Sequence, residues 1–308
     1  MSRFHPDEMA VQERMGVRER METAGGRVVR DHMPDQHREF FAELPFFFVG
    51  ALDGSGQPWA TVLVGEPGFL STPDERTLDI AGGLLPGDPL SGQLHVGDYI
   101  GGLGLVPATR RRNRVNGMIE TIGDGGMRVD VLQSFGNCPK YIQARDLVPA
   151  DGADAGARVL RAPQLSAQDR ELIAAADTFF IASANVDASA GEGRGVDVSH
   201  RGGQPGFVRI ADDGTLTVPD FMGNFFFNTI GNLAGHPRAG LLFIDYERGD
   251  LLHLVVEAQI IWDGAEVETM PGAERLLRFR VREAVRNVGA LPLRWSAPQL
   301  SPYLAALV

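Results

Sequence analysis

The segment PGFLSTPDERTLDI at residues 67–80 lies over PGFVRIADDGTLTV at residues 205–218 without a gap. Six of the fourteen aligned positions are identical at an offset of 138 residues, where about one identity is expected by chance. The same offset places Thr61 on Ser199 and Gly65 on Gly203. Because a repeat of this kind defines an architecture, we interpret the chain as one unit built twice.

The elements around the two segments repeat as well. Upstream, FFFVGA (46–51) lies over FFIASA (179–184), and each follows a helical stretch, DQHREFFAELP or SAQDRELIAAAD. The second stretch opens with Ser166 and Asp169 at the spacing of a capping box. Downstream, GGLGLV (101–106) lies over LLFIDY (241–246). Short strands between turn signals, with few helices, predict a mainly β fold of antiparallel β-barrels with flanking helices, in tandem duplication.

This repeat divides the chain into five parts. We expect an N-terminal helical arm (1–33), a first half (34–147), a Gly/Ala/Asp-rich linker (148–165), a second half (166–263) and a C-terminal helix and tail (264–308). The predicted C-terminal helix covers 272–289, where apolar residues fall at helical spacing: Leu277, Val281, Ala284, Val285 and Val288. Four arginines would form its other face, as a solvated surface or as an anion or partner site: Arg275, Arg278, Arg282 and Arg286.

Composition excludes several classes of function. The 308 residues include 29 basic and 40 acidic ones, and a net charge of −11 disfavours nucleic-acid and membrane-surface binding. No apolar run approaches the roughly 20 residues that cross a bilayer, and the charged N-terminus predicts no export. The single cysteine, Cys138, excludes internal disulfides and multi-thiolate metal sites, which suits a reducing cytoplasm. Residues 8–22 have helical spacing but little apolar face, so we expect a homodimer in which a partner orders them.

Strong catalytic motifs are absent from the sequence. It contains no G-x-x-x-x-G-K-[ST], G-x-G-x-x-G, G-x-S-x-G or H-E-x-x-H pattern, which disfavours P-loop, Rossmann, α/β-hydrolase and zincin functions. The seven histidines are scattered, with no pair at metal-ligand spacing, so no metal site is expected.

Polar residues gather at two places in the second half. The segment SHRGGQPGFVRI (199–210) places four of them at the edges of a turn between strands: Ser199, His200, Arg201 and Arg209. The segment 221–245 interleaves others with aromatic residues: Asn224, Asn228, Thr229 and Asn232. They either bind a ligand or cap the following helix while Phe225 and Phe227 pack.

The first half adds two basic segments, ATRRRNRVNG (108–117) and FGNCPKYIQAR (135–145). Strand alternation sends Arg110, Arg112 and Arg114 to one face and Arg111 to the other. They either line an anion pocket or form salt bridges across the barrel interface. Lys140 is the one lysine beside 28 arginines, and we expect it to contact a phosphate; the alternative is that its segment is a strand end at which Pro139 stops pairing. We expect Cys138 to be buried and inert.

These segments resemble the pyridoxamine 5'-phosphate oxidase superfamily of FMN-binding split β-barrels. The likeness rests on NLAGHPRAGLLF (232–243), on Pro205 and Arg209, and on VVEAQI (255–260). The first-half segments are similar to a subgroup of predicted flavin-nucleotide-binding proteins, and the resemblance covers about 35–295. It implies a duplicated FMN-binding split barrel, although Thr229 stands where the family carries a phosphate-binding lysine.

The resemblance implies a cofactor site and a class of reaction. The FMN phosphate would lie among residues of both halves: Ser199, His200, Arg201, Arg209, Asn224, Asn228, Thr229, Arg112, Arg114 and Lys140. The leading hypothesis is an FMN-dependent oxidoreductase acting on a small molecule, with His200 as the one catalytic candidate. A non-catalytic flavin or haem carrier or sensor is the alternative, a structural pseudo-barrel is the third, and haem or a deazaflavin would be the other cofactors.

Overall fold

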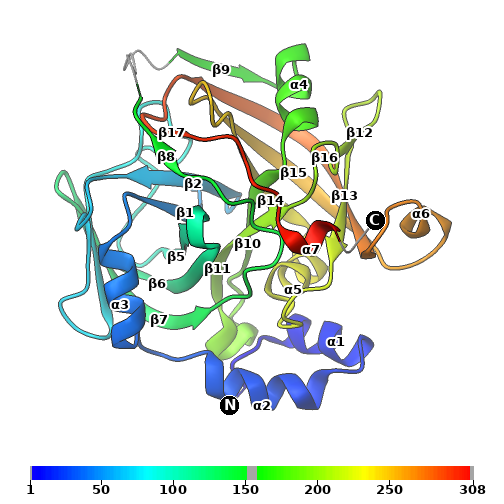
Figure 1. The fold of residues 1–308 in the computed structure, drawn as a ribbon. Helices are drawn as coiled ribbons and strands as arrows, with labels where there is room; N and C mark the ends of the chain where they lie inside the picture. The colour runs from blue at the N-terminus through cyan, green and yellow to red at the C-terminus, as the bar shows by residue number, and fades with distance from the viewer. Residues whose placement is uncertain (1, 151–157, 306–308) are drawn as a thin grey trace.

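A computed structural model describes residues 2–150 and 158–305 of the chain, and Figure 1 shows its course. The α-helices are α1 (Pro6–Arg14), α2 (Arg18–Val28), α3 (Asp35–Ala42), α4 (Ala167–Ala175), α5 (Asn228–Gly235), α6 (Ala265–Glu268) and α7 (Pro302–Ala305). Two 3-10 turns, η1 (Pro107–Thr109) and η2 (Ala188–Gly193), join strands. The strands of the first half are β1 (Phe46–Leu52), β2 (Pro58–Val64), β3 (Leu70–Ser71), β4 (Thr77–Ala81), β5 (Tyr99–Val106), β6 (Arg111–Gly123) and β7 (Gly126–Gly136).

The second half has strands in the same succession. They are β10 (Thr178–Asn185), β11 (Gly195–Gly202), β12 (Arg209–Ile210), β13 (Leu216–Phe221), β14 (Arg238–Ile244), β15 (Leu251–Ile261) and β16 (Ala273–Val288). The remaining strands are β8 (Leu147–Val148), β9 (Arg158–Ala162) and β17 (Arg294–Trp295). The mainly β fold expected from the sequence is therefore confirmed.

Both large sheets are antiparallel and have the same strand order. The first runs β2-β1-β5-β6-β7-β4-β3 and the second β11-β10-β14-β15-β16-β13-β12, with β9 added beside β16. Within the described residues neither sheet closes on itself, so each is an open barrel rather than a complete one.

Reciprocal contacts relate the two sheets by a pseudo-twofold axis. Phe48 of β1 stacks on Phe180 of β10 with ring centroids 3.6 Å apart. A Cβ on Gly101 would meet the backbone of Val196 and Asp197. A Cβ on Gly240 would meet the backbone of Pro58 and Trp59. Pro58 and Trp59 are equivalent to Val196 and Asp197 at the 138-residue offset, so the two contacts are reciprocal. The sheets therefore pack face to face at glycines, because larger residues would hold the backbones apart.

The Pro-Gly-Phe segments have matching surroundings in the two halves. Gly68 and Gly206 both have positive φ, 97° and 86°, as the turn requires. A Cβ on Gly65 would meet the ring of Phe69, as a Cβ on Gly203 would meet that of Phe207. The two segments that align in the sequence therefore share a turn conformation and a glycine–phenylalanine contact.

Alternation along β1 and β10 divides the hydrophobic core. Phe47 and Val49 face the core of the first half, and Phe179 and Ile181 that of the second. The other face of each strand packs between the two sheets, where Phe48 and Phe180 belong to one cluster. Both strands are therefore buried on both faces. Phe47 thus corresponds to Phe179, and Phe48 to Phe180, at an offset of 132 residues. The sequence alignment of FFFVGA on FFIASA has an offset of 133 residues and is therefore wrong by one residue. A one-residue slip exchanges the two faces of a strand. The same faces place Leu103 on Leu242, so the alignment of GGLGLV is wrong by one residue as well.

The predicted C-terminal helix over 272–289 is wrong, because these residues form the 16-residue strand β16. The register of β16 against β15 shifts between Val281 and Glu283, so Arg282 is an extra residue that reverses the alternation. Leu277, Val281 and Ala284 therefore reach the same core at a spacing that imitates a helix. Since β16 pairs with both β13 and β15, the expected end of the second half at residue 263 falls before its longest strand.

The N-terminal arm forms α1 and α2, as expected, and lies along the bottom of Figure 1 beneath α5. The expectation that a second copy orders this arm is wrong, because the arm packs against its own chain. Phe4 packs edge-on against Phe226, and Gln12 donates a hydrogen bond to the Phe226 carbonyl at 3.1 Å.

The predicted linker is only partly described. Of residues 148–165, 151–157 lie outside the described residues, and Arg158–Ala162 pair with β16 as β9. The predicted helices before β1 and β10 are confirmed as α3 and α4, and Ser166 and Asp169 form the expected capping box.

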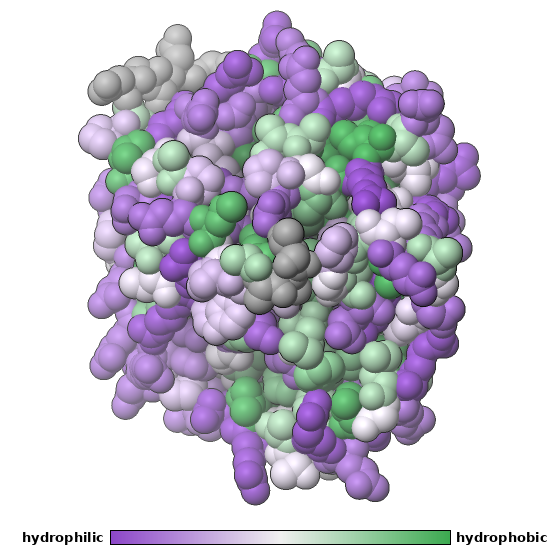
Figure 2. Space-filling view, turned by 45° about the vertical axis from the view of Figure 1, so that its right-hand side comes forward, coloured by the Kyte–Doolittle hydropathy of each residue, from purple (hydrophilic) through white to green (hydrophobic). Residues whose placement is uncertain are grey.

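Hydrophilic residues cover most of the face shown in Figure 2, and hydrophobic residues appear among them in small separate groups in its upper right, left and lower parts. Across residues 2–150 and 158–305, no helix has the length and apolarity needed to traverse a bilayer.

Candidate functional site

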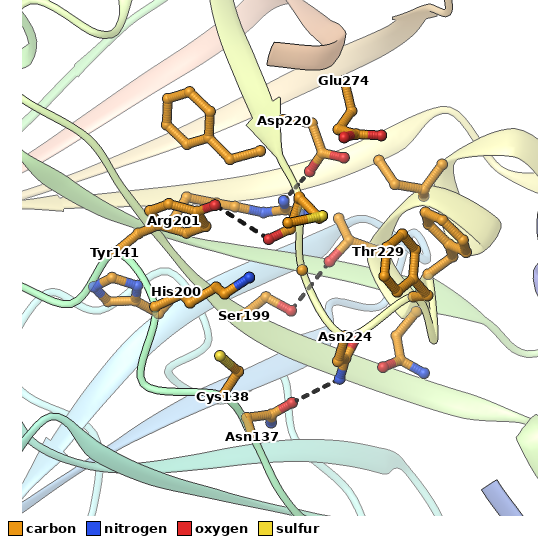
Figure 3. A pocket seen from close by; sticks show the side chains of 18 of the residues that line it. Asn137, Cys138, Tyr141, Ser199, His200, Arg201, Asp220, Asn224, Thr229 and Glu274 are labelled. Atoms are coloured by element: carbon orange, nitrogen blue, oxygen red, sulfur yellow. Dashed lines mark hydrogen bonds and ion pairs between the residues drawn. The ribbon is translucent and has the colours of Figure 1, made fainter. Parts of the chain in front are cut away.

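A polar pocket lies between the two halves, and Figure 3 shows it from close by. It encloses about 100 Å³. Its walls come from β6, the segment after β7, β11, β13, the loop before α5, the first turn of α5, and β16. Its lining residues are Arg112, Arg114, Asn137, Cys138, Lys140, Tyr141, Ser199, His200, Arg201, Asp220, Phe221, Met222, Gly223, Asn224, Phe225, Phe227, Asn228, Thr229, Ile230, Glu274 and Arg275.

Strand alternation on β6 brings two arginines to the pocket. Arg112 and Arg114 line the pocket. Arg111 is exposed on the other face of the strand, and its guanidinium lies 4.7 Å from the ring centroid of Phe40. The prediction that Arg112 and Arg114 share a face is therefore confirmed. Arg110 departs from it, because it precedes the strand with φ 55° and donates to the carbonyl of Ile142 instead.

Hydroxyl groups and the start of α5 form another wall. The Thr229 hydroxyl donates to that of Ser199 at 3.0 Å, and Figure 3 shows the two side chains pointing toward one another. Phe227, just before α5, has φ 64°, which turns the chain so that the first turn of the helix lines the pocket. The N-terminus of a helix carries free N–H groups and a partial positive charge, and both favour an anion.

Basic residues outnumber acidic ones in the lining. Five are basic, Arg112, Arg114, Lys140, Arg201 and Arg275, and two are acidic, Asp220 and Glu274. Asp220 is paired with both Arg201 and Arg275, and Arg114 pairs with Asp197 at 3.1 Å behind the pocket. In a chain with a net charge of −11, this excess of cations favours the binding of an anion here.

Arg112 has no acidic partner among the described residues. Its Nε donates to the Cys138 carbonyl at 2.9 Å, and no carboxylate oxygen lies within 4.0 Å of its guanidinium. Burial, and then the neighbouring charge of Arg114, lowers the pKa of Arg112 to about 9. A half-buried cation that has lost part of its hydration and has no counterion is stabilised by a bound anion.

His200 is neutral in this environment. Burial, and then the charges of Arg112 and Arg201, holds the pKa of His200 well below its ordinary value. Its Nδ1 atom is buried and has no hydrogen-bond partner among the described residues. A general acid or base works best with a pKa near the operating pH, so the structure does not favour His200 as a proton-transfer residue at neutral pH.

Nine of the ten residues proposed from the sequence line this pocket, and Arg209 does not. Arg209 is exposed on β12, where its guanidinium donates to the side chain and carbonyl of Thr269 at 2.8 and 2.7 Å. Arg209 therefore lies outside this pocket, because the two-residue strand β12 is at the edge of the sheet. That the other nine hold a cofactor stays a prediction.

Sequence reasoning missed Asp220 and Tyr141, and it placed Arg275 on the polar face of a helix, as part of a solvated surface or of an anion or partner site. Asp220 follows a proline in a short strand with no motif around it. The Tyr141 hydroxyl donates to the Met222 carbonyl at 3.1 Å, and the Asn224 amide donates to Asn137 at 3.1 Å, so these residues join the pocket wall from both halves. The described residues contain no group of three or more His, Cys, Asp or Glu side chains placed to hold a metal ion.

Comparison with known proteins finds similarity in solved structures alone. No family model matches the chain, and no curated protein matches it. The solved structures include an FAD-binding protein from Mesorhizobium loti, with a TM-score of 0.30, 14% identity, and coverage of 42% of this chain and 98% of its own. The haem storage protein HutZ from Vibrio cholerae has a TM-score of 0.27 and 15% identity, covering 40% and 93%. A protein of the pyridoxinephosphate oxidase family from Clostridium acetobutylicum has a TM-score of 0.26 and 12% identity, covering 39% and 81%. Of these three, the Clostridium protein is described as one of the pyridoxinephosphate oxidase family.

Proposed function

We propose that the pocket binds the phosphate of FMN and that the protein is an FMN-dependent oxidoreductase acting on a small molecule. The observation that carries this proposal is Arg112, a half-buried guanidinium without an acidic partner among the described residues, which faces the pocket beside Arg114, Lys140 and Arg201. A dianionic phosphate supplies the charge that this cluster lacks, and charge-assisted hydrogen bonds of this kind contribute about 1.5–3 kcal/mol each.

The residues present fit a phosphate group with a longer body attached. Arg112, Arg114, Ser199 and Thr229 offer cationic and hydroxyl donors at the polar end of the pocket. The enclosed 100 Å³ is smaller than the roughly 300 Å³ at which pockets for whole small molecules begin, so the ring system would extend past the mouth. Aromatic side chains stand among the lining residues for such contact, including Tyr141 and Phe221, whose ring centroids lie 5.0 Å apart.

In the proposed reaction a bound flavin supplies the hydride or electron chemistry, and this chain supplies binding and electrostatics. Arg112 and Arg114 hold the anionic end. Asp220 holds Arg201 in place, because it accepts hydrogen bonds from both Arg201 and Arg275. Since His200 is neutral, it contributes polarity to the wall rather than a mobile proton.

The decisive experiment is titration of the purified protein with FMN, followed by flavin fluorescence. Arg112→Gln should weaken binding about ten- to a hundredfold, because it removes charge-assisted bonds to the phosphate. The control is Arg209→Gln, an exposed arginine outside the pocket, which should leave the affinity unchanged. Equal affinity in wild type and Arg112→Gln would overturn the assignment of the site.

A second candidate function is a non-catalytic flavin or haem carrier. It is favoured by Thr229, which stands at the position of the lysine expected from the resemblance, and by the neutral His200, since haem iron binds neutral imidazole. The absorbance spectrum of the protein as isolated separates flavin, deazaflavin and haem. Bleaching of a flavin band by reduced nicotinamide would support the oxidoreductase, and a stable band would support the carrier.

A homodimer in the cytoplasm, expected from the sequence, stays a prediction that the proposed site does not require. Because both halves of one chain line the pocket, binding needs no second copy. Light scattering at micromolar concentration tests assembly, since a monomer has a mass of 33.3 kDa.

A further inference from the structure

The N-terminal arm reaches the wall of the pocket through one buried carboxyl group. Glu8 of α1 is 2% exposed. Its Oε1 accepts a hydrogen bond from the Asn228 amide at 2.6 Å, and its Oε2 accepts one from the His5 backbone at 2.9 Å. Asn228 lines the pocket, and Glu8 lies behind it, outside the lining residues.

The crossing of α1 and α5 depends on glycines in α5. A Cβ on Gly231 would lie 2.6 Å from Cγ of Glu8 and 2.8 Å from its Cα, and a Cβ on Gly235 would collide with the Asp7 carboxylate. The sequence NTIGNLAG thus leaves space on the side of α5 where the arm docks. His5 and Gln12 fix the arm on either side of Glu8, since the His5 ring lies 2.9 Å from the Asn232 side-chain oxygen.

Hydrogen bonds continue from Glu8 into the cationic wall. The Asn228 side-chain oxygen accepts from Arg114 at 3.3 Å while its amide nitrogen donates to Glu8. Arg114 also donates to Ser199 and to Asp197. Asn228 therefore has both of its functional groups engaged, one by the arm and one by the pocket.

We infer that Glu8 is a positioning residue of the proposed phosphate site, which acts through Asn228 on the orientation and charge balance of Arg114. This inference rests on the proposed function. A protonated Glu8 leaves the positive charge of Arg114 available to a ligand phosphate. An ionised Glu8 adds a negative charge next to it and competes for the same cation.

The charged neighbours of Glu8 decide when it ionises. Burial, and then the charge of Asp197 on β11, raises the pKa of Glu8 to about 8, against the opposing effects of its hydrogen bonds and of Arg114 on β6. His5 and Asp7 are the other titratable groups on its own helix nearby, and burial lowers the pKa of His5, which leaves that ring neutral. Glu8 is thus neutral at pH 7 and ionised above about pH 8, so phosphate affinity should fall across this interval.

The test is FMN titration of the full chain at about pH 7.0 and about pH 8.5, where the phosphate stays dianionic. Wild type should lose affinity by about fivefold or more between the two values, and Glu8→Gln should lose less than about twofold. Glu13→Gln, an exposed carboxylate on the same helix, is the matched control and should keep the wild-type loss. A variant that only loosened the arm would bind more weakly by the same factor at both pH values.

The outcomes separate this inference from the proposed function. Failure of wild type to bind FMN at either pH overturns the proposed function. Binding that is equally strong at both values in wild type, or an undiminished loss in Glu8→Gln, overturns the role of Glu8 alone. If Glu8→Gln does not fold, Asn228→Ala cuts the same connection, and persistence of the full loss in that variant would equally overturn the inference.

Discussion

Asp220 is the residue on which two of the pocket's arginines depend. It is buried on β13, and its two oxygens accept hydrogen bonds from Arg201 and Arg275. Arg275 is 2% exposed, so water cannot take the place of the Asp220 carboxylate as its hydrogen-bond partner. Removing one partner of a buried ion pair costs more than the pair itself contributes, because the remaining charge stays buried.

We therefore expect Asp220→Asn to lower the free energy of unfolding by about 3–5 kcal/mol. Urea unfolding followed by circular dichroism measures this change. Glu257→Gln is the matched control, since Glu257 pairs with Arg282 on the exposed surface and its loss should cost about 1 kcal/mol or less. Equal losses in the two variants would show that Asp220 does not hold the arginines as described.

Buried histidines predict acid sensitivity before the carboxylates titrate. Burial lowers the pKa of His5, His200 and His253, and lowers that of His37 to about 4. The unfolded chain takes up these protons near pH 6.5, so below that value it binds more protons than the folded chain. The free energy of unfolding should thus fall as the pH drops from about 6.5 toward 4.

Urea unfolding at about pH 7, 6 and 5 tests this slope. His37→Gln should make the decline shallower, because His37 is buried against Ser134 at 2.8 Å. His95→Gln should leave it unchanged, since the His95 side chain is 71% exposed. A stability that is flat over this range in wild type would refute the expectation.

Among the elements, the contact between α1 and α5 depends on glycines in α5, which have no side chain to keep the two helices apart. Gly231→Ala should detach the arm, because the new Cβ would lie 2.6 Å from Glu8 Cγ and 2.8 Å from the Glu8 backbone. The expected result is faster proteolysis and faster amide exchange within residues 4–28. Gly26→Ala in α2 is the control, since a Cβ there meets nothing within 4 Å, and it should stabilise that helix by up to about 1 kcal/mol. Unchanged exchange in the arm of Gly231→Ala would count against the described packing.

At the scale of the whole molecule, the pseudo-twofold axis generates a second position equivalent to the pocket, with different residues. His253 occupies the position of Arg114, because Leu103 pairs with Arg114 and the equivalent Leu242 pairs with His253. Two residues along the same strands, Leu251 occupies the position of Arg112. Thr61, the equivalent of Ser199, bonds instead to Asp88. The second position has thus exchanged its two arginines for an apolar residue and a neutral histidine.

We expect one FMN per chain, although the chain contains two similar halves. Isothermal titration calorimetry should give a stoichiometry near one, and Arg112→Gln should weaken all of the binding. A stoichiometry near two, with half of the sites unaffected in Arg112→Gln, would show that the second position also binds.

Features that depend on short-range pattern could be predicted from the amino-acid sequence alone. The Pro-Gly-Phe repeat, the helices before β1 and β10, the alternation of Arg112 and Arg114 and the aromatic segment before α5 follow from spacing within a few residues, and the structure bears out these elements. Turn glycines and strand alternation act locally, so they can be read without knowledge of the fold.

Tertiary structure decided what depends on partners distant in the chain. The extra residue at Arg282 made β16 imitate a helix, and only its pairing with β13 and β15 made it a strand. The same pairing brought Arg275 to Asp220, while the edge position of β12 took Arg209 away from the pocket. Glu8 meets Asn228 across 220 residues of sequence, a contact that no local pattern encodes. Which polar groups share a buried site is fixed by strand register and helix packing, and these come from the global burial of apolar faces.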